Sequence, residues 1–309
     1  MNNHLVFWVI FTLMISIMFY IDLYATDHRK GTVGIKSSLI WSGIWIGTAL
    51  LFNILIYFFM DLGHEKAIEF LAGYIIEKSL SVDNLFVFLM IFKFMDTSEK
   101  DQPHVLKWGI LSAIVLRIIF IMAGVTLISL FHPVIYIFGF VLFYAAYKMA
   151  FGSEQALDLE KNPLIKYVSR KFNVLTQYKG HKFFVKENKK VFLTPLFLTL
   201  LMIESADVIF AVDSIPAVIA ITKDPFIIIT SNIFAILGLR ALYFALAGIV
   251  DLFIYLKYGV AVVLGFVGIK MVLLDIYPIR TEYSLIFILV ILSFSVILSL
   301  IHKKKNTAV

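Results

Sequence analysis

The sequence predicts an all-α polytopic membrane protein with about nine transmembrane helices and a three-helix inverted repeat. Three observations lead to this prediction: 61% of the 309 residues are hydrophobic, only 16% are charged, and the mean hydropathy is +0.93. A soluble globule of this size could not hide so much apolar surface in one core. The composition therefore argues against a soluble enzyme, a disordered chain and a nucleic-acid-binding domain, despite a net charge of +6.

A helix that crosses the hydrocarbon core needs about 20 predominantly apolar residues. The first such stretch is not expected to be a cleaved signal peptide, because no basic region precedes it and no clear small-residue cleavage site follows it. Nine stretches are predicted to form spanning helices: His4–Leu23, Ser37–Met60, Ala67–Phe94, Leu106–Leu130, Val134–Phe151, Leu193–Ile221, Phe226–Val250, Tyr258–Leu274 and Tyr283–Ile301.

Lysine and arginine are distributed unevenly between the alternate loops of this arrangement. One side of the membrane carries 19 of them, and the other carries only Lys66, Lys223 and Arg280. Cytoplasmic loops are the ones enriched in Lys and Arg. We therefore expect the N-terminus outside and the C-terminus in the cytoplasm.

Two groups of three spans resemble each other. Glu77 and Asp83 in the third span match Asp207 and Asp213 in the sixth, with five residues between the acids in both. An arginine follows in the next span of each group, and a Lys-Met pair in the one after. Because each unit has an odd number of spans, the second would run inverted relative to the first, which is a transporter architecture. The alternative is that short apolar helices match by chance.

The repeat divides the chain into segments of different character. Residues 1–66 form an N-terminal two-helix region, 67–151 the first repeat, 192–274 the second repeat, and 275–309 a C-terminal helix with a basic tail. Residues 152–191 form a basic cytoplasmic loop with little secondary-structure signal. This loop is either a lid, regulatory segment or docking site, or a tether whose charge fixes topology and touches anionic lipid.

Charged side chains also lie inside the predicted spans. A charge at the centre of a spanning helix costs roughly 2.5–3.5 kcal/mol, so these groups are expected to face the interior of the bundle. They serve either a cation or proton site, or buried salt bridges that lock helices together. The acids are Glu77, Asp83, Glu204, Asp207 and Asp213, and the intramembrane charge partners are Arg117 and Arg240.

Helical spacing limits how these acids can combine. Residues six apart lie about 9 Å apart along the helix axis and about 120° around it, so the two acids of one motif could share an ion only if the helix unwinds. Otherwise one acid from each repeat converges at the midplane. We favour Asp83 with Asp213, because Asn84 and Ser214 follow them and Pro216 could break the backbone nearby and free its carbonyls.

The remaining acids, Glu77, Glu204 and Asp207, are expected to serve a second position on the ion pathway or to pair with Arg117 and Arg240. All seven histidines lie at span ends or in loops, and the chain has no cysteine. Carboxylate, amide and hydroxyl oxygens favour Mg²⁺, Ca²⁺ or Mn²⁺ over Zn²⁺ or Cu²⁺. No catalytic residue and no prosthetic group is expected. The predicted metal ligands are Glu77, Asp83, Asn84, Glu204, Asp207, Asp213 and Ser214.

Several stretches of the chain resemble the TerC family, most closely its Alx branch. They are Glu77-Lys-Ser-Leu-Ser-Val-Asp83-Asn84, Asp207-Val-Ile-Phe-Ala-Val-Asp213-Ser-Ile-Pro-Ala217, Thr230-Ser-Asn-Ile-Phe-Ala-Ile-Leu-Gly-Leu-Arg240, Lys257-Tyr-Gly259 and Gly268-Ile-Lys-Met271. The resemblance covers nearly the whole chain and is weakest in the basic loop. It implies a bacterial inner-membrane protein of a transporter superfamily.

The family is associated with manganese efflux and, by name, with tellurite resistance; the Alx branch carries a suggested redox role. Its motif acids fall on Glu77, Asp83, Asp207 and Asp213. The expected function is therefore export of a hard divalent cation, with Mn²⁺ as the transported ion, in exchange for protons. The alternative is a non-transporting membrane protein, such as a membrane-bound redox modulator or a tellurite-resistance component. Neither expectation is an enzyme, and membrane lipid is the other expected partner.

Overall fold

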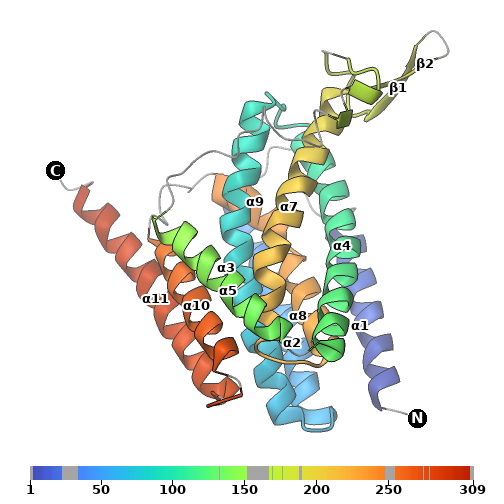
Figure 1. Ribbon diagram of the computed structural model, residues 1–309. Helices are drawn as coiled ribbons and strands as arrows, with labels where there is room; N and C mark the ends of the chain where they lie inside the picture. The colour runs from blue at the N-terminus through green and yellow to red at the C-terminus, as the bar shows by residue number, and fades with distance from the viewer. Residues whose placement is uncertain are drawn as a thin grey trace.

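The computed structural model describes residues 3–22, 34–131, 133–151, 167–168, 170–175, 177–187, 190–247, 255–273, 275–277 and 279–306. These residues form an all-α bundle that carries one two-stranded antiparallel hairpin (Figure 1). The predicted fold class is therefore confirmed at the level of an all-α protein.

The elements of the described residues follow one another as a series of long helices interrupted once by the hairpin. They are α1 (Asn3–Tyr20), α2 (Ile35–Phe59), α3 (Gly63–Phe94), α4 (Gln102–Leu130), α5 (Val134–Phe151), β1 (Phe184–Glu187), β2 (Lys190–Leu193), α7 (Pro195–Ile219), α8 (Pro225–Ile236), α9 (Leu239–Ala247), α10 (Leu256–Val272) and α11 (Thr281–Asn306).

Several helices are long and apolar enough to cross a membrane. Among the described residues there are six such segments: Ile35–Phe59, Gln102–Leu130, Val134–Phe151, Pro195–Ile219, Pro225–Ala247 and Thr281–His302. The apolar part of α1 is shorter, and α3 and α10 are not among the six. α3 carries the charged residues of the first acidic motif, which lowers its hydropathy. Several helices that are able to span a membrane are thus confirmed, while the count of nine and the three-helix repeat stay predictions.

The central helices bury their side chains and the peripheral ones expose theirs. α3 packs against α2, α7 and α8, and α4 packs against α7. Phe52 of α2 lies between Phe70 of α3 and Phe234 of α8, with ring centroids 5.6 Å and 4.9 Å away. By contrast, α2 and α11 turn apolar side chains such as Phe58 and Ile286 outward. Outward apolar faces are what lipid contact requires, because lipid offers no partner for polar groups.

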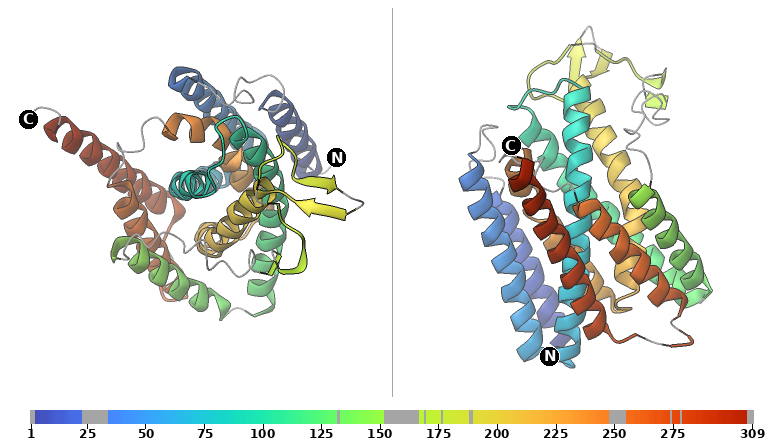
Figure 2. Two further views of the ribbon diagram at one scale, coloured as in Figure 1. Left: turned by 90° about the horizontal axis from the view of Figure 1, so that it is seen from above. Right: turned by 90° about the vertical axis from the view of Figure 1, so that its left-hand side faces the viewer.

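The directions of the helices define two ends of the bundle. α3 runs toward the end that carries β1 and β2, which we call the hairpin end, and α7 runs away from it to the opposite end (Figure 1). α5, α10 and α11 lie together on one side, and α1 lies on another (Figure 2). The opposite directions of α3 and α7 are those that the predicted inverted repeat requires.

Two glycines allow α5 and α10 to cross closely. A Cβ atom at Gly139 would lie 2.8 Å from a side-chain carbon of Val272, and one at Gly268 would lie 3.1 Å from the Gly139 carbonyl oxygen. Small residues permit such backbone approach in membranes, where van der Waals packing drives helix association.

The helix interruption lies elsewhere than predicted. α7 continues through Pro216, and neither α3 nor α7 is interrupted between its two motif acids. A proline inside a spanning helix is tolerated where neighbouring helices and local adjustment satisfy the freed backbone groups. The interrupted span is instead the one that follows α7. There Leu237 is extended and Gly238 has a φ of +82°, and the two residues separate α8 from α9.

Gly238→Ala is expected to destabilise the protein by about 2–4 kcal/mol. The left-handed backbone conformation opposes a side chain, and a Cβ there would lie 2.6 Å from Trp45 Cδ1, adding an overpacking penalty. The matched control is Gly265→Ala inside α10, whose Cβ would meet only Ala146 at 3.8 Å; it should raise stability by about 1 kcal/mol or less, because alanine favours a helix interior over glycine. Thermal unfolding of both purified variants in detergent measures the difference. Equal stability of the two variants would show that the interruption carries no strain.

The hairpin corrects the expectation of a loop with little secondary structure. Its register pairs Phe184 with Leu193 and Glu187 with Lys190. The Thr194 hydroxyl donates to the Lys182 carbonyl at 2.7 Å, which ties the hairpin to the start of α7. Residues 152–166 of the predicted basic loop lie outside the described part of the chain.

Candidate functional site

Arg117 is the centre of a charged cluster inside the bundle. It lies on α4 and is 1% exposed. Its Nη2 donates to Asp207 Oδ1 on α7 at 3.2 Å, and its Nη1 donates to Glu77 Oε1 on α3. The first acids of the two matched motifs are therefore brought together by one guanidinium, whose planar fork suits two carboxylates at once.

Polar side chains complete this cluster. Arg117 Nη1 also lies 3.4 Å from Ser214 Oγ and 3.3 Å from Asn232 Oδ1. Ser81 donates to Glu77 Oε1 at 3.4 Å. The Asn232 amide donates to the Ile228 carbonyl one turn back on α8, which fixes its oxygen toward the arginine. We call Arg117, Glu77, Asp207, Ser214 and Asn232 the Arg117 cluster; it joins α3, α4, α7 and α8.

Two carboxylate oxygens near this cluster lack a hydrogen-bond partner within the described part of the chain. They are Glu77 Oε2 and Glu204 Oε2. The other oxygen of Glu204 accepts a hydrogen bond of 2.6 Å from the Ser112 hydroxyl. A buried polar oxygen without a partner costs free energy, and such groups normally pair with protein, water or an ion. Among the described side chains, these two oxygens are therefore buried acceptors near the Arg117 cluster that no protein donor satisfies.

A small cavity of about 20 Å³ lies beside Glu204 and Asp207, on the side of Asp207 nearer the hairpin end. Its walls come from α3, α4, α7, and the residues that flank the α8–α9 interruption, Ile236 and Leu239. A cavity of this size is large enough for about one water molecule. Glu204 and Asp207 of α7 thus line a space with room for about one water molecule.

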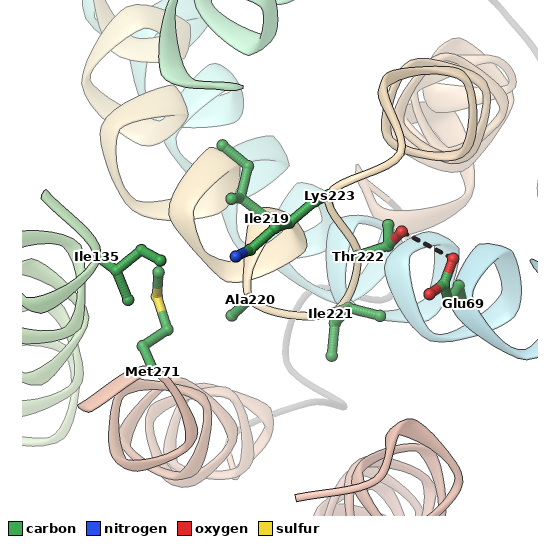
Figure 3. A pocket seen from close by; sticks show the side chains of 8 residues that line it. All are labelled: Glu69, Ile135, Ile219, Ala220, Ile221, Thr222, Lys223 and Met271. Atoms are coloured by element: carbon green, nitrogen blue, oxygen red, sulfur yellow. Dashed lines mark hydrogen bonds between the residues drawn. The ribbon is translucent and has the colours of Figure 1, made fainter. Parts of the chain in front are cut away.

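A larger cavity of about 150 Å³ lies at the opposite end, between the start of α3, the end of α7 and the end of α10 (Figure 3). Thr222 donates to Glu69 there at 2.7 Å. Lys66 bridges Glu69 at 2.9 Å and Asp224 at 3.3 Å, so the start of α3 is tied to the α7–α8 connection. Lys223 completes the charged lining.

Arg240 does not join the acids of the spans. Its Nη1 donates to the Asp22 backbone oxygen and to Asp22 Oδ2, both at 3.1 Å. The pair is buried, with side-chain exposures of 2% and 7%, and it ties α9 to the residues that follow α1. The two matched arginines therefore have different roles, one within the acid cluster and one at the N-terminal segment.

The structure brings together some of the predicted ligands. Glu77, Asp207 and Ser214 meet at Arg117, Glu204 lies at the small cavity, and Asn84 is buried on α3. The side chains of Asp83 and Asp213, the predicted convergent pair, lie outside the described residues. Among the side chains that are described, no group of three or more His, Cys, Asp or Glu residues could hold a metal ion.

Sequence reasoning missed several residues of the candidate site. Asn232 stands in the polar run Thr230-Ser-Asn232 of a span that is otherwise apolar, and that run was a usable signal. Ser112 has no such signal, because a lone serine in an apolar helix commonly bonds its own backbone. Lys270, of the second Lys-Met pair, is only 3% exposed.

Comparison with known proteins gives the family. The family model "Integral membrane protein TerC family" matches residues 62–307. The chain is 42% identical over 296 residues to "Putative membrane-bound redox modulator Alx" of Escherichia coli K12, covering 93% of this chain and 92% of that protein.

Other relatives agree. The chain is 40% identical over 308 residues to the protein of the same name from Photorhabdus laumondii, covering 97% and 96%. It is 42% identical over 297 residues to "Uncharacterized membrane protein STKORF319" of Myxococcus xanthus, covering 96% and 92%. No solved structure matches the chain. The sequence resemblance noted from the acidic motifs is confirmed, and the chain belongs to the TerC family of integral membrane proteins.

Proposed function

We propose that this protein is a secondary transporter that exports a hard divalent cation, with Mn²⁺ as the first candidate, from the cytoplasm in exchange for protons. The observation that carries the proposal is the pair of buried carboxylate oxygens, Glu77 Oε2 and Glu204 Oε2, without a partner among the described residues. Carboxylate oxygens are the ligands preferred by hard divalent ions.

The charges of the site favour a cation over an anion. Arg117 supplies one positive charge near three carboxylates, those of Glu77, Glu204 and Asp207. Asp83 and Asp213 lie on the same two helices, six residues beyond Glu77 and Asp207, and we propose them as the remaining ligands. Arg117 then acts as the resident counter-charge of Glu77 and Asp207, and an arriving ion competes with it for their oxygens.

The two cavities suggest the path. From the excess of lysine and arginine on that side, we infer that the hairpin end faces the cytoplasm. In this orientation the cation enters at the small cavity beside Glu204, reaches the Arg117 cluster and leaves through the larger cavity beside Glu69. The Lys66 bridge between Glu69 and Asp224 must open or rearrange when the ion leaves.

Proteoliposomes that contain a manganese-sensitive dye test the proposal. The wild-type protein is expected to carry Mn²⁺ across the bilayer. The flux should be faster when a proton gradient drives protons in the opposite direction to the ion. Asp83→Asn, Asp213→Asn and Glu204→Gln are each expected to lower the flux at least tenfold. The matched control is Glu65→Gln, which removes an exposed carboxylate at the start of α3 and should leave the flux unchanged.

Two outcomes would contradict the proposal. If no gradient of pH or manganese drives flux through correctly folded wild type, the protein does not transport this ion. If the wild type transports but Asp83→Asn and Asp213→Asn transport equally well at matched protein density, the assigned ligands are wrong. Cell-associated manganese under manganese excess provides the same comparison in living cells.

A second candidate function rests on the name of the Escherichia coli relative, "Putative membrane-bound redox modulator Alx". The chain has no cysteine, so a redox role would need a bound chromophore rather than thiol chemistry. An absorption spectrum of the purified protein tests this alternative. A stoichiometric visible band that responds to dithionite would favour it over transport.

A further inference from the structure

The interruption between α8 and α9 frees main-chain carbonyl groups inside the bundle. The last carbonyls of any helix lack partners within it, and in a membrane each unsatisfied group costs several kcal/mol. Here extended Leu237 and left-handed Gly238 end α8 abruptly. The carbonyls around this point therefore need donors or cations from elsewhere in the bundle.

The side chain of Lys78 meets this need. Its Nζ on α3 donates to the Ala235 carbonyl at 3.0 Å and lies 3.4 Å from the Leu237 carbonyl oxygen. The ammonium thus rests against neutral carbonyl oxygens of an interrupted helix. Unwound carbonyls and helix C-terminal ends are where membrane transporters hold small cations, and an ammonium group is a monovalent cation close to K⁺ in size.

The position of this contact links it to the candidate site. Ala235 follows Asn232 by three residues, about 4.5 Å along the helix axis, and Asn232 belongs to the Arg117 cluster. Ile236 and Leu239, on either side of the interruption, line the small cavity beside Glu204. The interruption is therefore adjacent to the cavity lining and about one helical turn from Asn232 of the Arg117 cluster.

We propose that the α8–α9 interruption is a monovalent-cation position built from main-chain carbonyls, which the protein fills with the tethered ammonium of Lys78. The oxygens in contact with Nζ are neutral, whereas protein sites for divalent ions rely on carboxylates, so the position is matched to a single charge. This assignment does not depend on which ion is transported. The competing explanation is that Lys78 only caps the end of α8.

Lys78→Ala separates the two explanations. The variant is purified in detergent, and its unfolding temperature is measured in potassium, sodium or choline chloride at one ionic strength. We expect a lower unfolding temperature in choline, and a recovery of at least roughly 3 °C in potassium or sodium. n-Propylammonium, which replaces the deleted part of the side chain, is expected to restore stability as well.

Three controls define the result. Wild type should show no such difference between potassium and choline. Lys78→Met fills the space without a charge, so it should be destabilised and should not recover in potassium. Lys93→Ala removes an exposed lysine from the same helix and should respond to no cation. None of these measurements uses manganese or flux, so they stand or fall separately from the transport proposal.

The proposal is overturned if Lys78→Ala has the same unfolding temperature in all salts, or if Lys78→Met recovers equally in potassium. If Lys78→Ala cannot be purified in choline, purification in potassium, sodium or n-propylammonium becomes the test. Recovery of folded protein in these salts supports the cation position, and failure in all of them identifies Lys78 as a structural cap.

Discussion

Replacing Arg117 with alanine is expected to lower the free energy of unfolding by about 3–5 kcal/mol, because removal of one partner leaves buried charges uncompensated. Glu77 is 0% exposed and Asp207 is 6% exposed, so water cannot take over the role of the guanidinium. The same change also removes contacts to Ser214 and Asn232. Denaturant titration of the purified protein in detergent measures the loss.

A double-mutant cycle isolates the ion pair. Glu77→Gln in the Arg117→Ala background removes one of the uncompensated charges, so the double variant is expected to be more stable than Arg117→Ala alone. Arg117→Lys keeps the charge but loses the fork, and it is expected to recover only part of the stability. If Arg117→Ala unfolds within about 1 kcal/mol of wild type, the cluster does not hold these helices together.

Replacing Arg240 with alanine is the second large expected effect, a loss of about 3 kcal/mol from the same cause. Its contacts with the backbone oxygen and carboxylate of Asp22 join α9 to the residues after α1. The effect should therefore appear first as detachment of α1, measured as faster amide exchange or proteolysis in that segment. Because Arg240 lies outside the Arg117 cluster, manganese flux per folded molecule should stay within about twofold of wild type.

Asp22→Asn provides the matched comparison. It keeps the backbone oxygen and one side-chain acceptor oxygen but removes the negative charge, so it should lower stability less than Arg240→Ala does. A loss of flux in Arg240→Ala as large as that in Arg117→Ala, at equal folded protein, would show that the two arginines act alike. The different contacts of Arg117 and Arg240 would then not correspond to different roles in transport.

The helices were predictable because hydropathy alone identifies long apolar stretches. α5 begins at Val134 and ends at Phe151, as the sequence predicts. The position of the interruption was not predictable in this way. Pro216 removes one hydrogen bond but leaves the helix direction, whereas Gly238 accepts a left-handed backbone that lets Trp45 pack closely. Whether the helix is interrupted at Pro216 or at Gly238 depends on how α2 packs, and the sequence alone does not show that packing.

The acids and arginines of the site could be identified from the sequence, because charged side chains inside a membrane cost free energy. Which acid pairs with which arginine could not be predicted. Both arginines follow their acid motif at similar spacing, which suggests equivalent partners. Arg117 reaches Glu77 and Asp207, while Arg240 reaches Asp22. Asp22 lies at the end of the first predicted span, far from Arg240 in sequence. Only the placement of α1 beside the bundle creates that pair, and no local pattern encodes it.

In the proposed transporter, the two cavities on either side of the Arg117 cluster would also determine where the membrane voltage acts. Water-accessible spaces carry little of the voltage, so the electric field concentrates in the thin layer of protein between them. Moving one elementary charge through this layer involves about 2.3 kcal/mol for each 100 mV. A divalent cation that leaves an inside-negative cell would oppose roughly twice that energy. In the proposed export cycle, an inward movement of protons offsets this cost, and only the charge left uncompensated makes the rate depend on voltage.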